Sequence, residues 1–170
     1  DRPIRSHDQL AGRFDRWICR RRRWIDDDDW HTIVEHVPIP SVDLVVMYSG
    51  GVVLGRRANE PAKGSWFLPG GRLEKGERLE ETVHRVAEEE VGLEVTIRQQ
   101  TAVHDHFYDV HDVDGVVTKQ YVSHGFLVEA AAGSSPVAAD DQHDEVRVFF
   151  DRPNNCHEYV AAHLDAAGVL

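Results

Sequence analysis

Lysine, cysteine and long apolar runs are all scarce in this chain of 170 residues. The lysines are Lys63, Lys75 and Lys119, and the two cysteines, Cys19 and Cys156, lie too far apart to indicate a disulfide framework or a cysteine-rich zinc site. No run approaches the roughly 18 apolar residues that cross a bilayer, and the first residues lack the apolar centre of a signal peptide. We therefore expect a soluble cytoplasmic protein without a membrane partner.

Positive charge is also in short supply. The chain has 30 acidic and 19 basic residues and a net charge of −11. This balance argues against nucleic acid as a partner, because such proteins need cations that displace counterions from phosphates. An anionic substrate would have to be attracted by local arginines and a metal ion rather than by the overall field of the protein.

Residues 1–36 are predicted to form an N-terminal helical extension. Apolar residues recur at helical spacing within 6–24, and the arginines at 20–23 stand just before the aspartates at 26–29. Opposite runs of this kind are more often a paired, solvated surface than a nucleic-acid site. The aspartates are suited to cap a second short helix that carries Trp30, because aspartate is a good N-cap.

Residues 37–170 are predicted to form one globular unit with a substantial core, since 41% of the chain is hydrophobic. Strands flank the Ser-Gly-Gly turn at 49–51, and further strands are expected within 94–108, 117–129 and 145–150. A helix is expected to start near Arg78 and another to occupy 156–167, with a loop at 131–141. This order predicts an α/β fold in which helices cover both faces of a mixed β-sheet.

Residues 70–93 contain the most informative pattern, a glycine turn that leads into an acidic helix. Glu81, Arg85 and Glu89 follow at steps of four, so the arginine can orient carboxylates on either side of it. Glu89 and Glu90 are neighbours about 100° apart on a helix, able to surround one hard cation. Gly70 lets the backbone approach closely and leaves its carbonyl oxygen available as a further ligand.

The order Gly71, Glu77, Arg85, Glu89, Glu90 and Gly92 resembles the Nudix box. The resemblance implies an α/β/α sandwich fold, a divalent metal and hydrolysis of a nucleoside diphosphate linked to another group. Val86 departs from the pattern, because the family usually carries a further glutamate at that position.

Three flanking segments, 57–72, 106–109 and 141–144, look like the GDP-mannose mannosyl hydrolase branch of this superfamily. That branch also has an aliphatic residue at the position of Val86. Its enzymes attack the sugar carbon and release the nucleoside diphosphate and the free sugar with inversion. Displacement at carbon needs the diphosphate stabilised as a leaving group, for which fewer carboxylates suffice.

The resemblance to this branch implies a role for each matching residue. It places Mg²⁺, with Mn²⁺ as an alternative, on the Gly70 carbonyl, Glu90 and Gln142. It places Arg57, Arg72 and Tyr121 on the phosphates, and Asp43 and His106 on the sugar side. Trp30 would lie near the guanine, and Arg85 would support the helix carboxylates. It also implies a homodimer. His143 is the expected base, because histidine can accept a proton from water near neutral pH and His143 stands in the matching segment.

Three functions follow from these residues. The first is a Mg²⁺-dependent hydrolase of nucleotide sugars such as GDP-mannose or GDP-glucose that acts at the anomeric carbon. The second is a pyrophosphohydrolase that attacks phosphorus, favoured by Glu89, which departs from the branch and is suited to a second metal. The third is a non-catalytic nucleotide-sugar sensor that lost turnover together with the glutamate that Val86 replaces.

Overall fold

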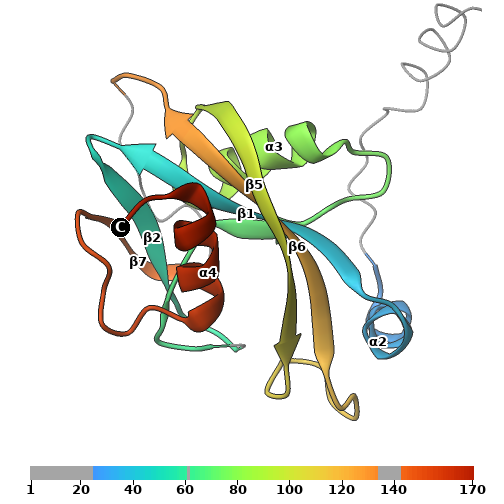
Figure 1. The fold of residues 1–170 in the computed structure, drawn as a ribbon. Helices are drawn as coiled ribbons and strands as arrows, with labels where there is room; N and C mark the ends of the chain where they lie inside the picture. The colour runs from blue at the N-terminus through green and yellow to red at the C-terminus, as the bar shows by residue number, and fades with distance from the viewer. Residues whose placement is uncertain (1–24, 61, 134–142) are drawn as a thin grey trace, which may run out of the picture.

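A mixed seven-stranded sheet lies between two helices in the computed structural model, which describes residues 25–60, 62–133 and 143–170. Helix α3 (Leu79–Val91) covers one face and α4 (Glu158–Ala167) the other, while α2 (Asp27–His36) stands at one end of the sheet (Figure 1). The expected α/β/α sandwich is therefore confirmed. The helix expected at 6–24 and most of the loop expected at 131–141 lie outside the described residues.

The sheet has the strand order β3-β2-β1-β6-β5, with β4 paired to β1 and β7 paired to β2. The strands are β1 (Ile39–Tyr48), β2 (Gly51–Arg57), β3 (Trp66–Phe67), β4 (Gly70–Arg72), β5 (Val95–Tyr108), β6 (Lys119–Ala130) and β7 (His143–Phe149). Strands β1 and β6 run parallel and the other pairs run antiparallel, which makes the sheet mixed.

Strand β1 is the centre of the sheet, and one of its edges is divided between two partners. Strand β6 pairs with it from Ile39 to Met47, whereas on the other edge β4 lies opposite residues 41–43 and β2 opposite residues 46–48. Between these partners the Leu44 N–H donates to the carbonyl of Pro69 at 2.8 Å. The divided edge brings the glycine turn of β4 directly against Asp43.

Two apolar layers fix the helices to the sheet. Alternation along β1 sends Val42, Leu44 and Val46 toward α3 and Val45 toward α4, as the two-residue period of a strand requires. The α3 layer contains Val83, Val86, Ala87, Val91, Leu93, Val95, Phe126 and Val128, and the α4 layer contains Val52, Leu54, Trp66, Phe67, Leu68, Val160 and Leu164. Each fully buried valine or leucine stabilises the fold by about 1.5–3 kcal/mol.

Helix α2 begins as the sequence predicts. The Asp26 carboxylate caps it by accepting a hydrogen bond from the Asp29 N–H at 2.9 Å, and three more aspartates occupy the first turn. Among the described residues, no helix is both long and apolar enough to cross a membrane.

Helix α3 has a defined start and a defined end. At its start the Arg78 N–H donates to the Glu81 carboxylate at 2.9 Å, and its last turn closes on Gly92, whose φ is 65°. This left-handed conformation lets the Gly92 N–H reach the carbonyls of Ala87 and Glu88 and so satisfies the end of the helix. The length of α3, and hence the place of Glu90 near its end, depends on this glycine.

We expect Gly92→Ala to destabilise the fold by about 1–2 kcal/mol, because an L side chain in the left-handed region is strained. Gly92→Asn is the matched control, since asparagine tolerates this conformation, and it should lose clearly less. Urea unfolding of the two variants beside the parent measures the difference. Equal stability of the alanine variant and the parent would show that the cap does not limit α3.

Candidate active site

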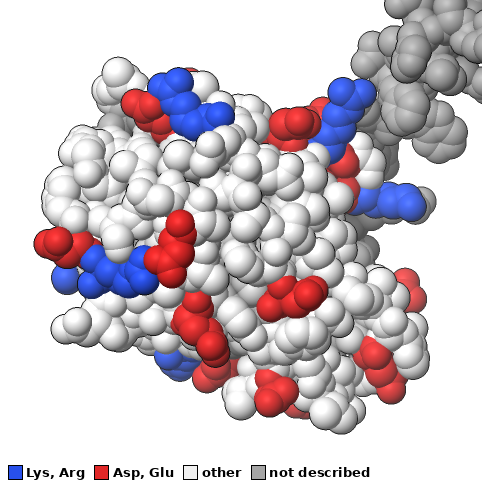
Figure 2. Space-filling view, viewed as in Figure 1, with Lys and Arg blue, Asp and Glu red and all other residues white. Residues whose placement is uncertain are grey.

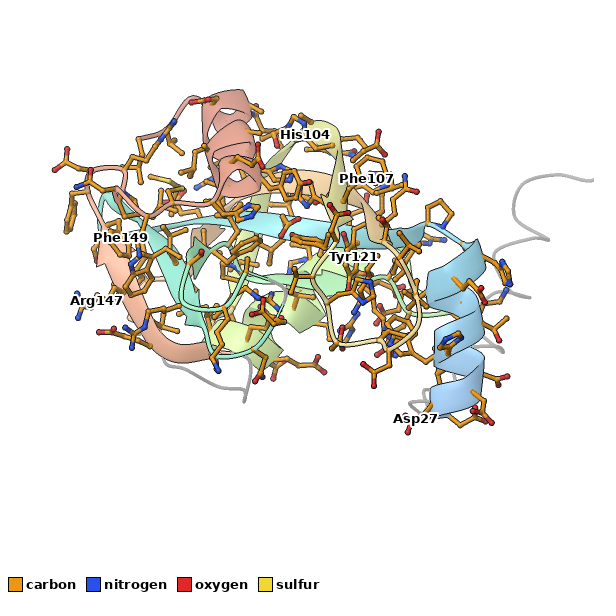
Figure 3. The ribbon with its side chains drawn as sticks, turned by 90° about the horizontal axis from the view of Figure 1, so that it is seen from below. Asp27, His104, Phe107, Tyr121, Arg147 and Phe149 are labelled. Carbon is orange, nitrogen blue, oxygen red and sulfur yellow. The ribbon has the colours of Figure 1, made fainter. Side chains whose placement is uncertain are left out.

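One cavity opens where β4 and β2 separate along β1. Eight of the residues singled out from the sequence line it, and they come from seven different elements. They are Trp30 of α2, Asp43 of β1, Arg57 of β2, Gly70 and Arg72 of β4, Glu90 of α3, His106 of β5 and Tyr121 of β6. Figure 3 shows Tyr121 in the middle of the molecule, among side chains that converge from several strands.

Arg85 ties the middle of α3 to the turn that precedes the helix and to β4. Its guanidinium donates to both oxygens of Glu77 at 2.8 and 2.9 Å, to Glu89 at 3.1 Å and to the carbonyl of Arg72 at 3.0 Å. The partner in the turn is thus Glu77, eight residues earlier, while Glu81 accepts the N–H of Arg78 at the start of the helix. Arg85 does not line the cavity, so we assign it a positioning role.

Glu90 supplies a buried carboxylate to the cavity. It is a buried residue at 5% exposure, and its carboxylate accepts a hydrogen bond from the Gly70 N–H at 2.8 Å. Two of the residues expected to bind Mg²⁺, Gly70 and Glu90, therefore stand side by side. A carboxylate and a backbone carbonyl are donors that suit a hard cation. Glu89 is more exposed and faces Arg85.

Two arginines provide positive charge in the same cavity. Arg57 stacks over Phe67 at 5.4 Å and Arg72 over Trp30 at 5.4 Å, and neither guanidinium forms an ion pair with any described residue. The Nε of Arg57 is buried and has no hydrogen-bond partner in that same part of the chain. Acidic and basic side chains are interspersed on the face seen in Figure 2. Two arginines that line one cavity and form no ion pair with any described residue provide a local site for an anion.

Trp30 closes the cavity at the α2 end. Its ring also contacts the ammonium of Lys119 at 5.2 Å, and this lysine is buried and paired with Asp112 at 2.8 Å. Cations of this kind hold an indole in place through its negative ring face. The side chain is thus oriented toward the cavity, as a residue that stacks on a base needs to be.

Asp43 and His106 are the polar side chains that line the cavity beside the glycine turn, and Asp43 lies opposite Gly70 in the sheet. Ser123 donates a hydrogen bond to Asp43 and lies 3.1 Å from Nε2 of His163. Burial raises the pKa of Asp43, although His106 and Ser123 act in the opposite direction. Burial also lowers the pKa of His106, and that of His163, to about 4, so both rings are neutral at pH 7.

The sequence did not single out the residues around Asp43. Ser123 and His163 are fully enclosed and come from β6 and α4. The sequence of β5 does contain a pattern that indicates a polar strand face, because His104, His106 and Tyr108 alternate and hence share one face of the strand. Nothing in the sequence places α4 over that face, so the sequence could not predict that His163 lies beside Asp43.

The remaining candidates are placed only in part. The backbone of His143 pairs with that of Arg57 at a register shift between β7 and β2, which puts the start of β7 beside a residue of the cavity. Gln142 lies outside the described residues. Val86, where a glutamate would be usual, is 1% exposed and packs in the α3 core layer.

The contact between Arg85 and Glu77 predicts a pH dependence. Burial of Glu77 opposes its ionisation, but hydrogen bonds from Arg85, the Glu74 N–H and Thr82 outweigh burial and hold the pKa of Glu77 below 4.5. Because the folded pKa lies below the unfolded one, the unfolded chain takes up the proton first as the pH falls. The stabilisation is therefore present above pH 4.5 and is lost as the pH falls through the folded pKa.

We expect Glu77→Gln to lower the free energy of unfolding by roughly 1.5–3 kcal/mol near neutral pH, the contribution of hydrogen bonds to a charged group. The difference between parent and variant should shrink as the pH falls below 4.5. Glu88→Gln, on the exposed face of α3, is the matched control and should have little effect at any pH. Denaturant unfolding across this range makes the comparison, and a difference that does not change with pH would contradict the assigned ion pair.

The chain matches known proteins in both sequence and structure. The family model of the NUDIX domain matches residues 37–163. The chain is 44% identical to the low-salt glycan biosynthesis protein Agl8 of Haloferax volcanii over 84% of this chain and 90% of that protein. It is 32% identical to an ADP-ribose pyrophosphatase of Methanocaldococcus jannaschii over 69% of this chain and 64% of that protein. The crystal structure of a MutT NUDIX hydrolase from Burkholderia pseudomallei has a TM-score of 0.61 and 25% identity, covering 76% of this chain and 97% of that one. The family match, the relatives and the sandwich fold agree, and the chain belongs to the Nudix hydrolase family.

Proposed function

We propose that this protein is a Mg²⁺-dependent hydrolase of nucleoside diphosphate sugars, such as GDP-mannose or GDP-glucose, that releases GDP and free sugar. The observation that carries the proposal is the composition of the cavity. Residues from seven elements bring a buried carboxylate beside Gly70, two arginines without an ion pair to any described residue, and the polar side chains of Asp43 and His106 into one space. A nucleoside diphosphate sugar carries the groups that these residues suit, a diphosphate with its metal ion and the hydroxyls of the sugar.

The diphosphate would lie between Glu90 and the two arginines. Arg57 and Arg72 donate to its oxygens, and their positive charge is most useful as negative charge builds up on the departing diphosphate. Mg²⁺ held by Glu90 and the Gly70 carbonyl would neutralise the same charge. Glu90 is buried and held by the Gly70 N–H, so its orientation is fixed before the substrate binds.

Water attack at the anomeric carbon needs a base on the face opposite the leaving group. We assign this role to His143, whose backbone lies opposite Arg57 in the sheet. A neutral imidazole can take the proton from water as the bond to carbon forms. Asp43 and His106 line the cavity and would hold the sugar.

The relatives support the class of substrate. The name of Agl8 places that protein in glycan biosynthesis, in which sugars are commonly carried by nucleotides, and the chain covers 90% of it. Val86 supports attack at carbon, because it leaves one carboxylate fewer for an additional cation beside the phosphate.

A second candidate is attack at phosphorus by a pyrophosphohydrolase. It is favoured by Glu89, which lies one residue from Glu90 on α3, and by the likeness to the ADP-ribose pyrophosphatase. The two reactions differ in which bond is cleaved and therefore in their products.

Heavy-oxygen water distinguishes the two reactions. We expect GDP-mannose and Mg²⁺ in this water to yield labelled free mannose and unlabelled GDP. Mass spectrometry of both products gives the position of the label. Label in GMP or in sugar phosphate would overturn the proposal in favour of attack at phosphorus, and tight binding without any product would indicate a sensor.

The role of His143 is tested by His143→Ala. Loss of a general base should lower kcat about 10²- to 10⁴-fold, with a much smaller change in KM. His36→Ala, an exposed histidine of α2, is the matched control and should behave as the parent. A His143 variant with the activity of the parent would remove the assignment.

A further inference from the structure

A second group of potential metal ligands is centred on Asp43, which lines the cavity. Asp43 of β1, His106 of β5 and His163 of α4 each offer one ligand atom, and these atoms all lie within 4.8 Å of one another. Asp43 and His106 line the cavity, whereas His163 does not line it and is buried at 1% exposure. Figure 3 shows the neighbouring His104 on the same side of the sheet as α4.

The distances in this group suit shared coordination better than direct hydrogen bonding. Oδ2 of Asp43 lies 3.8 Å from Nδ1 of His106 and 3.6 Å from Nε2 of His163. Nitrogen–oxygen hydrogen bonds measure about 2.7–3.2 Å, so both separations are too long for one. Ligands bound tetrahedrally to one ion at about 2.0–2.2 Å lie roughly 3.3–3.6 Å apart, so the two separations from Asp43 are already close to those of a metal site. The two imidazoles, whose ligand atoms lie within 4.8 Å of each other, would have to approach each other to complete it.

The surroundings are built around these side chains. Gly125 of β6 makes room for His163, because a Cβ at this position would lie 2.4 Å from its Nδ1. Ser123 contacts both Asp43 and His163 and orients them. Nε2 of His106 and Nδ1 of His163 point away from Asp43 and are buried without a hydrogen-bond partner among the described residues. No protein donor there requires a lone pair, so each neutral ring can carry its proton on that nitrogen and present the lone pair of the other nitrogen toward Asp43.

A buried carboxylate also requires compensation. The side chain of Asp43 is only 13% exposed, and no arginine or lysine of the described residues forms a direct ion pair with it; Ser123 donates to it and Arg57 acts on it only from a distance. Burying a carboxylate without a direct ion pair is costly, and a cation between Asp43 and two neutral imidazoles would offset that cost. Neutral histidine is the form that binds metals.

We propose that Asp43, His106 and His163 form a second metal site, selective for a divalent cation that accepts nitrogen ligands, such as Zn²⁺. Two imidazoles and one carboxylate distinguish it from the oxygen site at Glu90, which suits Mg²⁺. The side of the ion that faces the cavity stays open to water or to a hydroxyl of the substrate. The site is independent of which bond of the nucleotide is cleaved.

Co²⁺ is the probe, because nitrogen ligands and a low coordination number give it a visible absorption that hydrated Co²⁺ lacks. The full chain is stripped with a chelator, supplied with excess Mg²⁺ to fill the oxygen site, and titrated with Co²⁺ without nucleotide. We expect one strongly absorbing Co²⁺ per chain, displaced by Zn²⁺. A spectrum of hydrated Co²⁺ throughout would overturn the proposal.

Variants assign the ligands. His163→Gln should weaken Co²⁺ binding at least about 10-fold, as the loss of a ligand or of its support does. Glu90→Gln and His84→Gln, an exposed histidine of α3, should retain the spectrum. Binding by His163→Gln equal to that of the parent, or a spectrum lost only in Glu90→Gln, would place the ion elsewhere.

Asp43→Asn keeps the test decisive if the His163 variant does not fold. It preserves the shape of the side chain and removes only its charge, and circular dichroism establishes that each variant is folded. The folded Asp43 variant should lose the Co²⁺ spectrum, and retention of the spectrum would contradict the site. Because the readout needs no turnover, failure of this proposal and failure of the proposed hydrolysis are distinguishable.

Discussion

The hydrogen bonds of Arg85 hold the site together. One guanidinium binds the turn through Glu77, the helix through Glu89 and the backbone of β4 through the Arg72 carbonyl. With these three segments fixed, Glu90 faces Gly70 and the Arg72 side chain reaches Trp30. Arg85 itself stays outside the cavity, so its contribution is to the arrangement of groups that contact the substrate.

The local structure of this site could be predicted from the sequence because its signals are local. Asp26 caps a helix, Gly92 ends one, and the glycines at 50 and 51 turn a hairpin, each through its own backbone chemistry. The resemblance to one branch of the family added candidate residues from segments that are distant in sequence. Eight of these candidates line one cavity.

The remaining features depend on contacts that no local pattern encodes. Arg85 takes its partner in the turn from Glu77, which the four-residue steps of the helix do not indicate. His163 reaches Asp43 only because α4 packs across β1 and β5. Strand β4 has three residues, too short for a hydrophobic period to reveal it.

The parallel pairing of β1 with β6 has a consequence for how the protein acquires its site. Ser123 and Asp43 are 80 residues apart in sequence, and their strands join only after the chain between them has been looped out. Contacts of such long range slow folding, because the entropy of closing the loop is lost before the contacts form. The cavity therefore exists only in the completed sheet, so a ligand that occupies it favours the fully folded chain over any partly folded form.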